Sequence, residues 1–363
     1  MTAPARIAKG LYWDEAWSLV SGCTHVSPGC DHCWSATETH MRANNPNEKV
    51  KARNEGLTEQ GSFNGQVRLN YDFLDKPLRK RKPTVYAVWN DLFHEDVPDE
   101  FRDQAFAVIL ACHIWNNVPE HKFLILTKRA GSMAEYFSAG AEALLKRWAK
   151  AGDGWLICDD PDIYFSELIE SAVCHDWDKA GTNSSGSPYK PWGYLHQLWP
   201  LPNVWLGVTA ENQEQADKRI PILLQIPAAV RWVSVEPMLG PINLSHLDHA
   251  WQTNALTGKQ SDMGRPYYDT GKLDWVACGG ESGHGARPLH PDMAWGLMDQ
   301  CVSVGIPFFF KQWGEWINDY PNHLESKCWK QTYQHGTTFY RVGKKNAGRL
   351  LDGRTWDDMP VVV

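Results

Sequence analysis

The chain has 363 residues, of which 43% are hydrophobic and 22% charged, a composition typical of soluble globular proteins. Its formal net charge of −7 excludes a uniformly basic surface, so any contact with nucleic acid requires a local basic patch. No run approaches ~18 consecutive apolar residues, and the N-terminus lacks the apolar segment of a signal peptide. We therefore expect a cytoplasmic protein with no membrane partner, in which the nine cysteines are mostly free thiols or metal ligands.

Short apolar runs recur along the chain, and helix-length stretches at 99–115 and 213–225 separate some of them. Continuous apolar runs of this length suit parallel strands that are buried on both faces. Their alternation with helices predicts an α/β fold whose crossovers are right-handed. Seven strands fall short of the eight of a closed barrel, so we expect a partial, open (β/α) barrel. The predicted strands are 17–20, 84–88, 123–126, 204–208, 231–235, 275–278 and 307–310.

Two long segments interrupt this pattern within a barrel domain that we place at residues 1–312. The segment 131–202 has a predicted helix at 141–151 and an exposed loop or lid at 181–193, which is rich in Gly, Ser and Pro. The polar segment 244–272 is a second predicted inserted loop. Residues 313–363, rich in Trp, Tyr and basic residues, are predicted to form a C-terminal appendage.

Cys23, Cys30 and Cys33 follow the first predicted strand with the spacing Cys-x6-Cys-x2-Cys. Pro28 and Gly29 between them are a strong turn signal, so the cysteines lie in a loop. We expect a helix to begin near Asp31 and to continue to Arg42. The two-residue spacing of the last two thiols is common among metal chelates.

Three thiols without a fourth nearby cysteine leave one metal position open, whereas structural iron–sulfur and zinc sites normally have four ligands. An iron–sulfur cluster with one open iron is one interpretation. The alternatives are a closed zinc site completed by His25 or His32, and free thiols without metal. The other cysteines are scattered and are predicted to be packing residues: Cys112, Cys158, Cys174, Cys278, Cys301 and Cys328.

The cysteine segment resembles a phage- and bacterium-borne branch of the radical S-adenosylmethionine (SAM) superfamily, distantly akin to spore photoproduct lyase. The usual spacing of that superfamily is Cys-x3-Cys-x2-Cys, and here the first gap is longer by three residues. Further blocks carry the resemblance along almost the whole chain: WNDLFH at 89–94, LTKR at 126–129, WLGVT at 205–209, SVEP at 234–237, GGESG at 279–283, FFKQWG at 309–314 and LDGR at 351–354.

The resemblance implies a [4Fe–4S] cluster on Cys23, Cys30 and Cys33, with SAM as cofactor and an electron donor such as flavodoxin. Cleavage of SAM would give a 5′-deoxyadenosyl radical. The implied substrate is a modified thymine in phage DNA or its nucleotide, in which N-linked glycyl-thymine is isomerised to the Cα-linked form. The modification would protect viral DNA from host restriction, in the cytoplasm of the host. Repair of DNA photoproducts is an alternative, as is a zinc-stabilised nucleic-acid-binding or defence module without catalysis.

The carboxyl ends of the predicted strands carry the remaining candidates, because active sites of barrels lie at that end. Asn90 and Asp91 follow the second strand, where the resemblance implies binding of the SAM amino group; a helix cap is the alternative for Asp91. Thr127 follows the third strand, and the adjacent Lys128 or Arg129 could pair with a carboxylate of SAM or substrate. A surface ion pair is the alternative for these two cations.

Candidates on the later strands complete the site. Glu211, with Asn212, could bind a ribose or the SAM carboxylate. Glu236 follows the fifth strand, where a buried carboxylate is costly unless it binds something. Gly279 and Gly280 could allow a ligand close to the backbone, with Glu281 beside it. Lys311 and Gln312 follow the seventh strand. We expect Glu236, Lys128 and Lys311 to act in catalysis and the others to bind cofactor.

Two further features could contact DNA. The basic run at 76–82 could bind phosphates, although such runs are usually solvated surface. Trp313, Trp316 and Tyr320 could stack on bases. His40 and His94 are predicted to be structural.

Overall fold

The structure is a computed structural model that describes residues 4–115, 118–156, 165–166, 199–247, 252–261, 268–318, 329–332 and 336–361. The loop predicted at 181–193 lies outside these residues, as does Tyr320. Three of the scattered cysteines also lie outside them: Cys158, Cys174 and Cys328.

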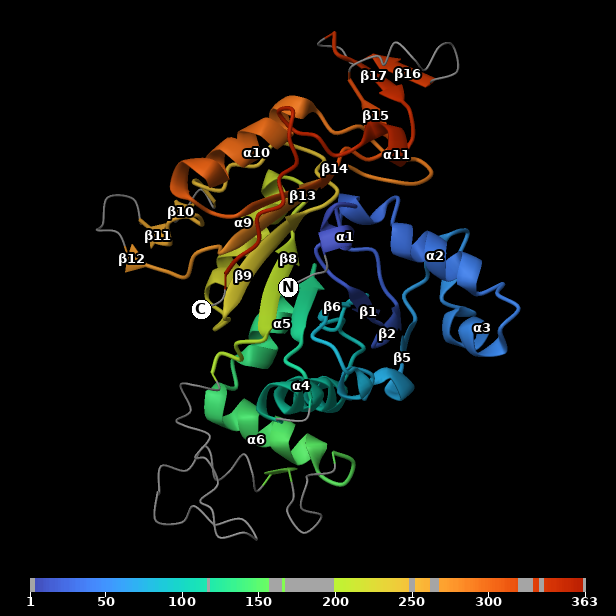
Figure 1. Cartoon of the computed structure of the whole chain (residues 1–363), viewed down its shortest axis with the longest axis vertical. Helices are drawn as coiled ribbons and strands as arrows, with labels where there is room; N and C mark the ends of the chain where they lie inside the picture. The colour runs from blue at the N-terminus through green and yellow to red at the C-terminus, as the bar shows by residue number, and fades with distance from the viewer. Residues whose placement is uncertain are drawn as a thin grey trace.

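A seven-stranded parallel sheet forms the centre of the molecule and curls into a half-barrel (Figure 1). Its strands occur in the sheet in their chain order, which is the arrangement of a partial (β/α) barrel and confirms the predicted fold at that level. Every neighbouring pair is parallel. In order across the sheet, the strands are β1 (Glu15–Trp17), β6 (Val85–Val88), β7 (Lys122–Thr127), β8 (Val204–Thr209), β9 (Val230–Val235), β13 (Trp275–Gly279) and β14 (Phe308–Gln312).

The first and last strands differ from their predicted ranges. The predicted strand 17–20 is wrong as a single element, because the chain leaves the sheet after Trp17 and then forms β2 (Val20–Gly22), which pairs antiparallel with β5 (Val67–Leu69). The side chain of Asn70 holds this turn by donating to the carbonyl of Ser18 at 2.9 Å. The last strand extends to Gln312, so Lys311 and Gln312 lie inside it and not after it.

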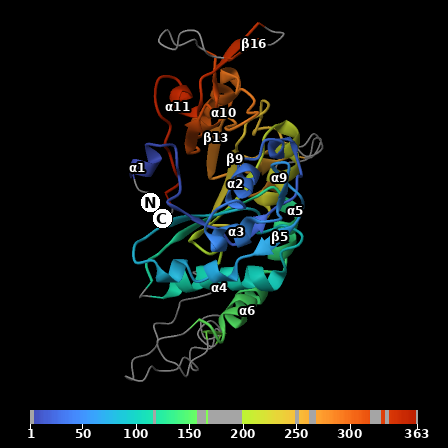
Figure 2. The same ribbon diagram turned by 90° about the vertical axis from the view of Figure 1, so that its right-hand side faces the viewer.

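Helices cover the outer face of the sheet (Figure 2). The helices predicted at 99–115, 141–151 and 213–225 are present, each with its last residue shifted by one. The side chain of Asn212 caps α9 by accepting from the backbone N–H of Gln215 at 3.0 Å. Because Asn212 serves this backbone, its predicted role with a ligand is replaced by a structural one. The helices of this layer are α4 (Asp99–Ile114), α5 (Ala130–Phe137), α6 (Ala141–Gly152), α9 (Gln213–Leu224) and α10 (Pro291–Val304).

A separate small lobe carries the cysteine segment. It contains α2 (Trp34–Arg42), α3 (Glu48–Asn54) and the hairpin of β3 (Thr58–Glu59) with β4 (Ser62–Phe63), together with β2 and β5. The N-terminal helix α1 (Pro4–Ile7) precedes β1. Figure 1 shows this lobe beside the sheet, on the side away from α10.

Two apolar cores lie on the two faces of the sheet. The larger core joins its outer face to the helices, while a smaller one fills the inside of the half-barrel with aromatic rings. Inside, the ring of Trp275 contacts Trp232 and Trp205 at centroid distances of 5.1 and 5.8 Å. Gly207 makes room for them, because a Cβ there would lie 2.4 Å from the Trp232 ring. The aromatic side chains close the barrel at the amino ends of its strands and leave space above them.

The predicted insertion at 244–272 and the predicted C-terminal appendage each contain a small sheet. Within 244–272, β10 (Thr253–Asn254), β11 (Lys259–Gln260) and β12 (Tyr268–Asp269) form an antiparallel sheet. After the barrel, β15 (Trp316–Ile317), β16 (Trp329–Thr332) and β17 (Thr338–Arg341) form another, followed by α11 (Lys344–Ala347). The chain then returns to β14, where the Phe310 N–H donates to the Trp356 carbonyl at 2.9 Å and the Trp356 ring is buried in the larger core.

No helix among the described residues is long and apolar enough to cross a membrane.

Candidate active site

A cavity of about 310 Å³ lies inside the half-barrel at the carboxyl ends of the strands. All of the predicted site residues line it except Glu211, Asn212 and Gly279. The lining members of that set are Cys23, Cys30, Cys33, Asn90, Asp91, Thr127, Lys128, Arg129, Glu236, Gly280, Glu281, Lys311 and Gln312. The structure therefore brings together predicted residues from five strand ends and from the cysteine segment.

The cysteine segment is a loop that begins at β2 and ends where α2 begins. Pro28 to Cys30 form one turn of 3₁₀ helix, and Cys33 has an extended backbone at the N-terminus of α2. The expected helix start near Asp31 is thus wrong by three residues, because the 3₁₀ turn and the extended Cys33 interrupt the helical path. All three thiols are partly exposed and free.

Burial governs the acidity of these thiols. It raises the pKa of Cys23 to about 11, with a further contribution from the negative charge of Asp91, while the neighbouring Arg129 partly opposes both. Burial also raises the pKa of Cys33, against the lowering effect of backbone N–H groups at the start of α2. In the absence of metal both are protonated at neutral pH, so a bound metal must displace their protons.

The three thiols and the two nearby histidines are the predicted metal ligands. Among the described residues, no three His, Cys, Asp or Glu side chains converge as they would around a single metal ion. His25 Nε2 donates to Asp31 Oδ1 at 2.7 Å, and His32 packs against Gly285, so neither predicted fourth ligand is directed at the thiols in this structure. A cubane cluster binds one thiolate per iron, and its sulfurs surround the cluster without converging on one ion. Three cysteines around one cavity fit that donor set.

Asp91 is fully engaged by its neighbours. Its two oxygens accept from Thr127 Oγ1 at 2.6 Å, from Arg129 Nη1 at 2.8 Å, and from the backbone N–H groups of Phe93 and Lys128 at 3.0 and 3.3 Å. The carboxylate is buried and has no spare acceptor position. In this arrangement Asp91 holds the ends of β6 and β7 together.

Asn90 is also engaged. Its backbone has a φ of 57°, in the left-handed region, which Asn tolerates better than most residues. Its side chain donates to the Val20 carbonyl at 2.9 Å and accepts from Ser35 at 2.7 Å. Asn90 therefore joins β6 to β2 and α2, and through them positions the cysteine loop.

Glu211 ties the same loop to β8. The side chain is fully buried and accepts from the Gly29 N–H at 3.0 Å, from Arg219 at 3.0 Å and from Lys128 Nζ at 3.5 Å. Burial by itself raises the pKa of this carboxyl, but the two cations and the hydrogen bonds outweigh burial and lower the pKa to about 2. Glu211 is ionised at neutral pH, and in this structure its carboxylate is engaged by the cysteine loop and by two cations.

Glu236 and Lys311 form an ion pair on the inner wall. Glu236 Oε2 accepts from Lys311 Nζ and from the Tyr12 hydroxyl, each at 3.1 Å, while Oε1 is buried and has no hydrogen-bond partner among the described residues. Burial and the charge of Glu236 both raise the pKa of Tyr12, which stays protonated. Gly279 makes room for this group, since a Cβ there would lie 3.1 Å from Glu236 Oε1.

The glycine loop packs against the segment that follows β14. A Cβ at Gly280 would lie 2.0 Å from the backbone oxygen of Trp313, so glycine is needed here for contact with that segment. Glu281 is held by Arg287, whose Nη2 and Nε donate to it at 2.7 and 2.9 Å. Arg287 also donates to the Pro28 carbonyl at 2.8 Å.

The strand-end carboxylates therefore each have a cation as partner. Asp91 pairs with Arg129, Glu236 with Lys311, and Glu281 with Arg287, while Glu211 pairs with Arg219 and Lys128. Sequence reasoning did not identify Tyr12, Arg219 or Arg287, because each lies outside the strand ends and becomes part of the site through a contact distant in sequence. Lys128 is the least constrained cation, since its one ion pair among the described residues spans 3.5 Å.

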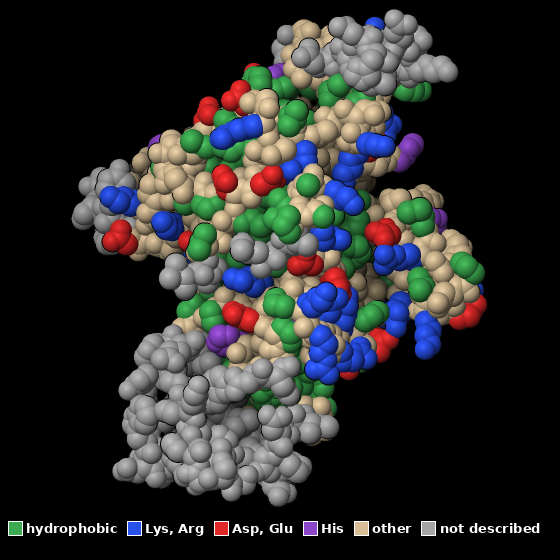
Figure 3. All heavy atoms as spheres, in the orientation of Figure 1, with side chains coloured by type: hydrophobic (Ala, Val, Ile, Leu, Met, Phe, Trp, Pro, Cys, Tyr) green, Lys and Arg blue, Asp and Glu red, His purple; other side chains and the backbone are tan. Residues whose placement is uncertain are grey.

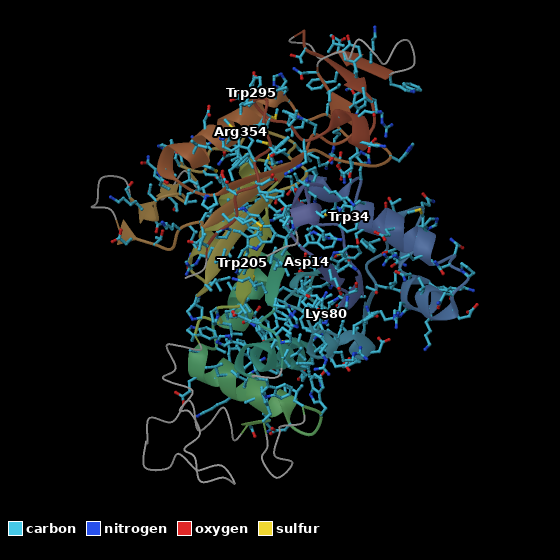
Figure 4. The ribbon with its side chains drawn as sticks, in the orientation of Figure 1. Asp14, Trp34, Lys80, Trp205, Trp295 and Arg354 are labelled. Carbon is cyan, nitrogen blue, oxygen red and sulfur yellow. The ribbon has the colours of Figure 1, made fainter. Side chains whose placement is uncertain are left out.

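The basic run at 76–82 lies away from the cavity. It precedes β6, so it occupies the amino end of the strands, where Figure 3 shows Lys and Arg side chains around the position at which Figure 4 labels Lys80. Lys76 and Lys80 pair with Glu15, and Arg79 pairs with its neighbour Asp75. A role at the cavity mouth is therefore excluded for the run by its position.

The other side chains singled out from the sequence have structural contacts. Trp316 is buried and donates to the Ala286 carbonyl at 2.6 Å, and Trp313 packs on Phe310 at 4.8 Å between ring centroids. His94 is buried beside Thr24, with 2.9 Å between His94 Nε2 and Thr24 Oγ1, and burial lowers its pKa.

Comparison with known proteins identifies one family. The sequence matches the family described as "Protein of unknown function (DUF5131)" over residues 8–360. No curated protein and no solved structure matches the chain significantly.

Proposed function

This chain belongs to the DUF5131 family, whose function is unknown, and we propose from its cavity that it is a radical SAM enzyme with a partial barrel of the radical SAM type. The observation that carries the proposal is the placement of Cys23, Cys30 and Cys33 along one cavity, at the catalytic end of a parallel half-barrel. The motifs that resemble the radical SAM superfamily support the same assignment.

In the proposal, the three cysteines hold a [4Fe–4S] cluster. When bound, the cluster and SAM supply one-electron cleavage of SAM to a 5′-deoxyadenosyl radical, with the electron coming from a flavodoxin-like donor. The protein positions the cluster loop by three contacts: Glu211 holds Gly29, Asn90 holds Ser35, and Arg287 holds Pro28. The three bracing residues lie in the segments that follow β6, β8 and β13, so the loop is braced against much of the barrel mouth.

Lys128 is the side chain best suited to bind a carboxylate of SAM. A Cβ at Gly29 would lie 2.9 Å from Lys128 Nζ, which places the ammonium group directly beside the cysteine loop. Arg129 is unsuited to that role because Asp91, Glu95 and Thr24 occupy its guanidinium. Lys128 therefore takes the binding role, and Arg129 has a positioning role.

We propose that the substrate is a modified thymine of phage DNA, and that the reaction converts N-linked glycyl-thymine into its Cα-linked isomer. Such an isomerisation leaves the number of atoms and electrons unchanged. The ion pair of Glu236 with Lys311 supports this choice, because it offers opposite charges to the amino and carboxylate groups of a glycyl substituent. The assignment to a modified thymine rests on the family resemblance.

The test of the enzyme class is purification and reconstitution without oxygen. We expect about four irons per chain and formation of 5′-deoxyadenosine with SAM and a reductant. Cys30→Ala should lose both, whereas Cys301→Ala, which alters a buried cysteine in α10, should keep both. Stoichiometric zinc without iron in protein handled without oxygen would refute the assignment.

A second assay addresses the substrate. DNA or nucleotide that contains N-linked glycyl-thymine is incubated with reconstituted enzyme. The products are separated by chromatography, and their masses are measured by mass spectrometry. The proposal expects a product of unchanged mass and different retention. Reversal of a dinucleotide photoproduct in a parallel assay would favour repair instead.

A further inference from the structure

Three tryptophans line one side of the cavity as a connected set, which we call the tryptophan rim: Trp13, Trp34 and Trp89. The ring of Trp89 lies between the other two, with its centroid 5.1 Å from Trp34 and 5.9 Å from Trp13, in edge-to-face contacts. Figure 4 labels Trp34 beside the start of α2. The rim therefore joins the small lobe to the segment that precedes β1.

Trp34 is unusual because it is 51% exposed while it borders the cavity. A large aromatic ring gains free energy from burial, so an indole left open beside a cavity marks a contact surface. Trp34 also follows Cys33 directly and begins α2. A group that packs on its ring is thereby placed close to the cysteine loop.

Two arginines accompany the rim. The guanidinium of Arg6 lies 4.9 Å from the centroid of the Trp13 ring, and that of Arg42 lies 5.7 Å from the Trp89 ring. Arg42 pairs with Glu38, whereas no carboxylate among the described residues pairs with Arg6. Aromatic rings alternating with positive charges are the combination by which proteins bind unpaired nucleic acid, through base stacking and phosphate contacts.

We propose that the tryptophan rim is a stacking surface for an unpaired base of a DNA strand, which it delivers to the cavity. The inference deepens and rests on the proposed function, since chemistry on a base requires that the base leaves the helical stack. A thymine inside a duplex could not reach Glu236 and Lys311 on the inner wall. Trp34 takes the base, and Arg6 contributes charge for the adjoining phosphates.

The test measures binding of a fluorescein-labelled oligothymidylate by fluorescence anisotropy, with reconstituted enzyme. Trp34→Ala should weaken binding about tenfold, the loss expected when one base loses its aromatic partner, and Trp34→Phe should retain most of the affinity. Trp295→Ala is the matched control, because Trp295 is 42% exposed on α10, in a separate part of the molecule (Figure 4). A duplex of the same sequence should bind more weakly than the single strand.

Several outcomes would overturn the inference. They are equal binding by Trp34→Ala and wild type, no binding of single strands by wild type, and an equal loss in Trp295→Ala. A fourth is loss of SAM binding in Trp34→Ala with oligothymidylate binding unchanged, which would make Trp34 a partner of the SAM adenine. Thermal unfolding of each variant checks that the fold is intact, as expected for exposed positions.

The same series separates this inference from the proposed function. Trp34-dependent binding of oligothymidylate by a protein that takes up no iron would contradict only the radical SAM assignment. Iron uptake and SAM cleavage, together with an oligothymidylate affinity that is unchanged in Trp34→Ala, would contradict only the stacking surface. Cys30→Ala, without a cluster, should still bind the oligonucleotide in a Trp34-dependent way.

Discussion

The guanidinium of Arg129 lies against the sulfur of Cys23, with 3.7 Å between Nη1 and Sγ. The same nitrogen donates to Asp91 at 2.8 Å, and Nε donates to Glu95 at 2.8 Å. The acidic partners fix the positive charge beside the thiol, and they raise the pKa of Arg129 further above its ordinary value although burial opposes this. A permanent cation is therefore built against one proposed cluster ligand.

Removal of this cation should make the cluster harder to reduce. In Arg129→Gln, loss of a charged donor worth about 1.5 kcal/mol corresponds to a midpoint potential lower by on the order of 60 mV. Potentiometric titration followed by EPR measures the shift, and Arg147→Gln, which alters an arginine paired with Asp99 and Asp103, is the control. An unchanged potential at full iron content would contradict the role of Arg129.

Glu211 should make stability depend on pH in the acid range. Its pKa falls from 4.5 to about 2 on folding, so its contribution is fully present above 4.5 and is lost as pH falls towards 2. We expect Glu211→Gln to lower the free energy of unfolding of the metal-free protein by roughly 3 kcal/mol at pH 7, because Arg219 loses a buried partner. Urea denaturation at several pH values measures this difference.

The difference between wild type and Glu211→Gln should shrink steadily as the pH falls from 4.5 towards 2. The exposed Glu214 in α9, the helix that follows Glu211, supplies the control, and Glu214→Gln should change stability little at any pH. A difference that is constant across this range would show that the charge of Glu211 is not what stabilises the fold.

Gly280 should not tolerate a side chain. A Cβ would lie 2.0 Å from the Trp313 carbonyl oxygen, so Gly280→Ala must displace the backbone of the next segment. We expect a loss of more than about 2 kcal/mol and reduced iron uptake. Gly296 in α10 has open space around its Cβ position, and Gly296→Ala should stabilise the protein by about 0.5–1 kcal/mol. Thermal unfolding compares the two, and equal effects would contradict the packing argument.

Arg287 should control how firmly the protein retains its cluster. It joins Glu281 of the glycine loop to Pro28 and Asp31 of the cysteine loop. Arg287→Lys cannot keep all of these directional contacts, so iron should pass to a chelator several-fold faster than from wild type. Release is followed by absorbance. Arg147→Lys serves as the control. If Arg287→Lys lost iron at the same rate as wild type, Arg287 would have no role in positioning the cysteine loop.

The local pattern of the sequence was sufficient to predict six of the seven strands of the half-barrel. Apolar runs marked these strands, whereas β1 ends at the first residue of its predicted run. In β7 the alternate residues Leu124 and Leu126 line the cavity, and Lys128, directly after the strand, continues the pattern. Alternation along a strand is set by the chain's own backbone geometry, and for that reason it can be recognised without knowledge of any neighbour. The cysteine loop could also be predicted from the sequence, because its turn residues and its three thiols lie within one short segment.

The pairing of charges depended on the folded arrangement. Glu211 meets Gly29 across 182 positions of sequence, and Arg287 meets Pro28 across 259. The strand order decides which side chains share the barrel mouth, and burial then requires each carboxylate to find a cation there. The same long-range contacts let Glu211 hold the cysteine loop directly and Glu281 hold it through Arg287, whereas Asp91 joins the ends of β6 and β7. Local periodicity contains no information about such partners, since it describes the direction of a side chain and not the element that it will face.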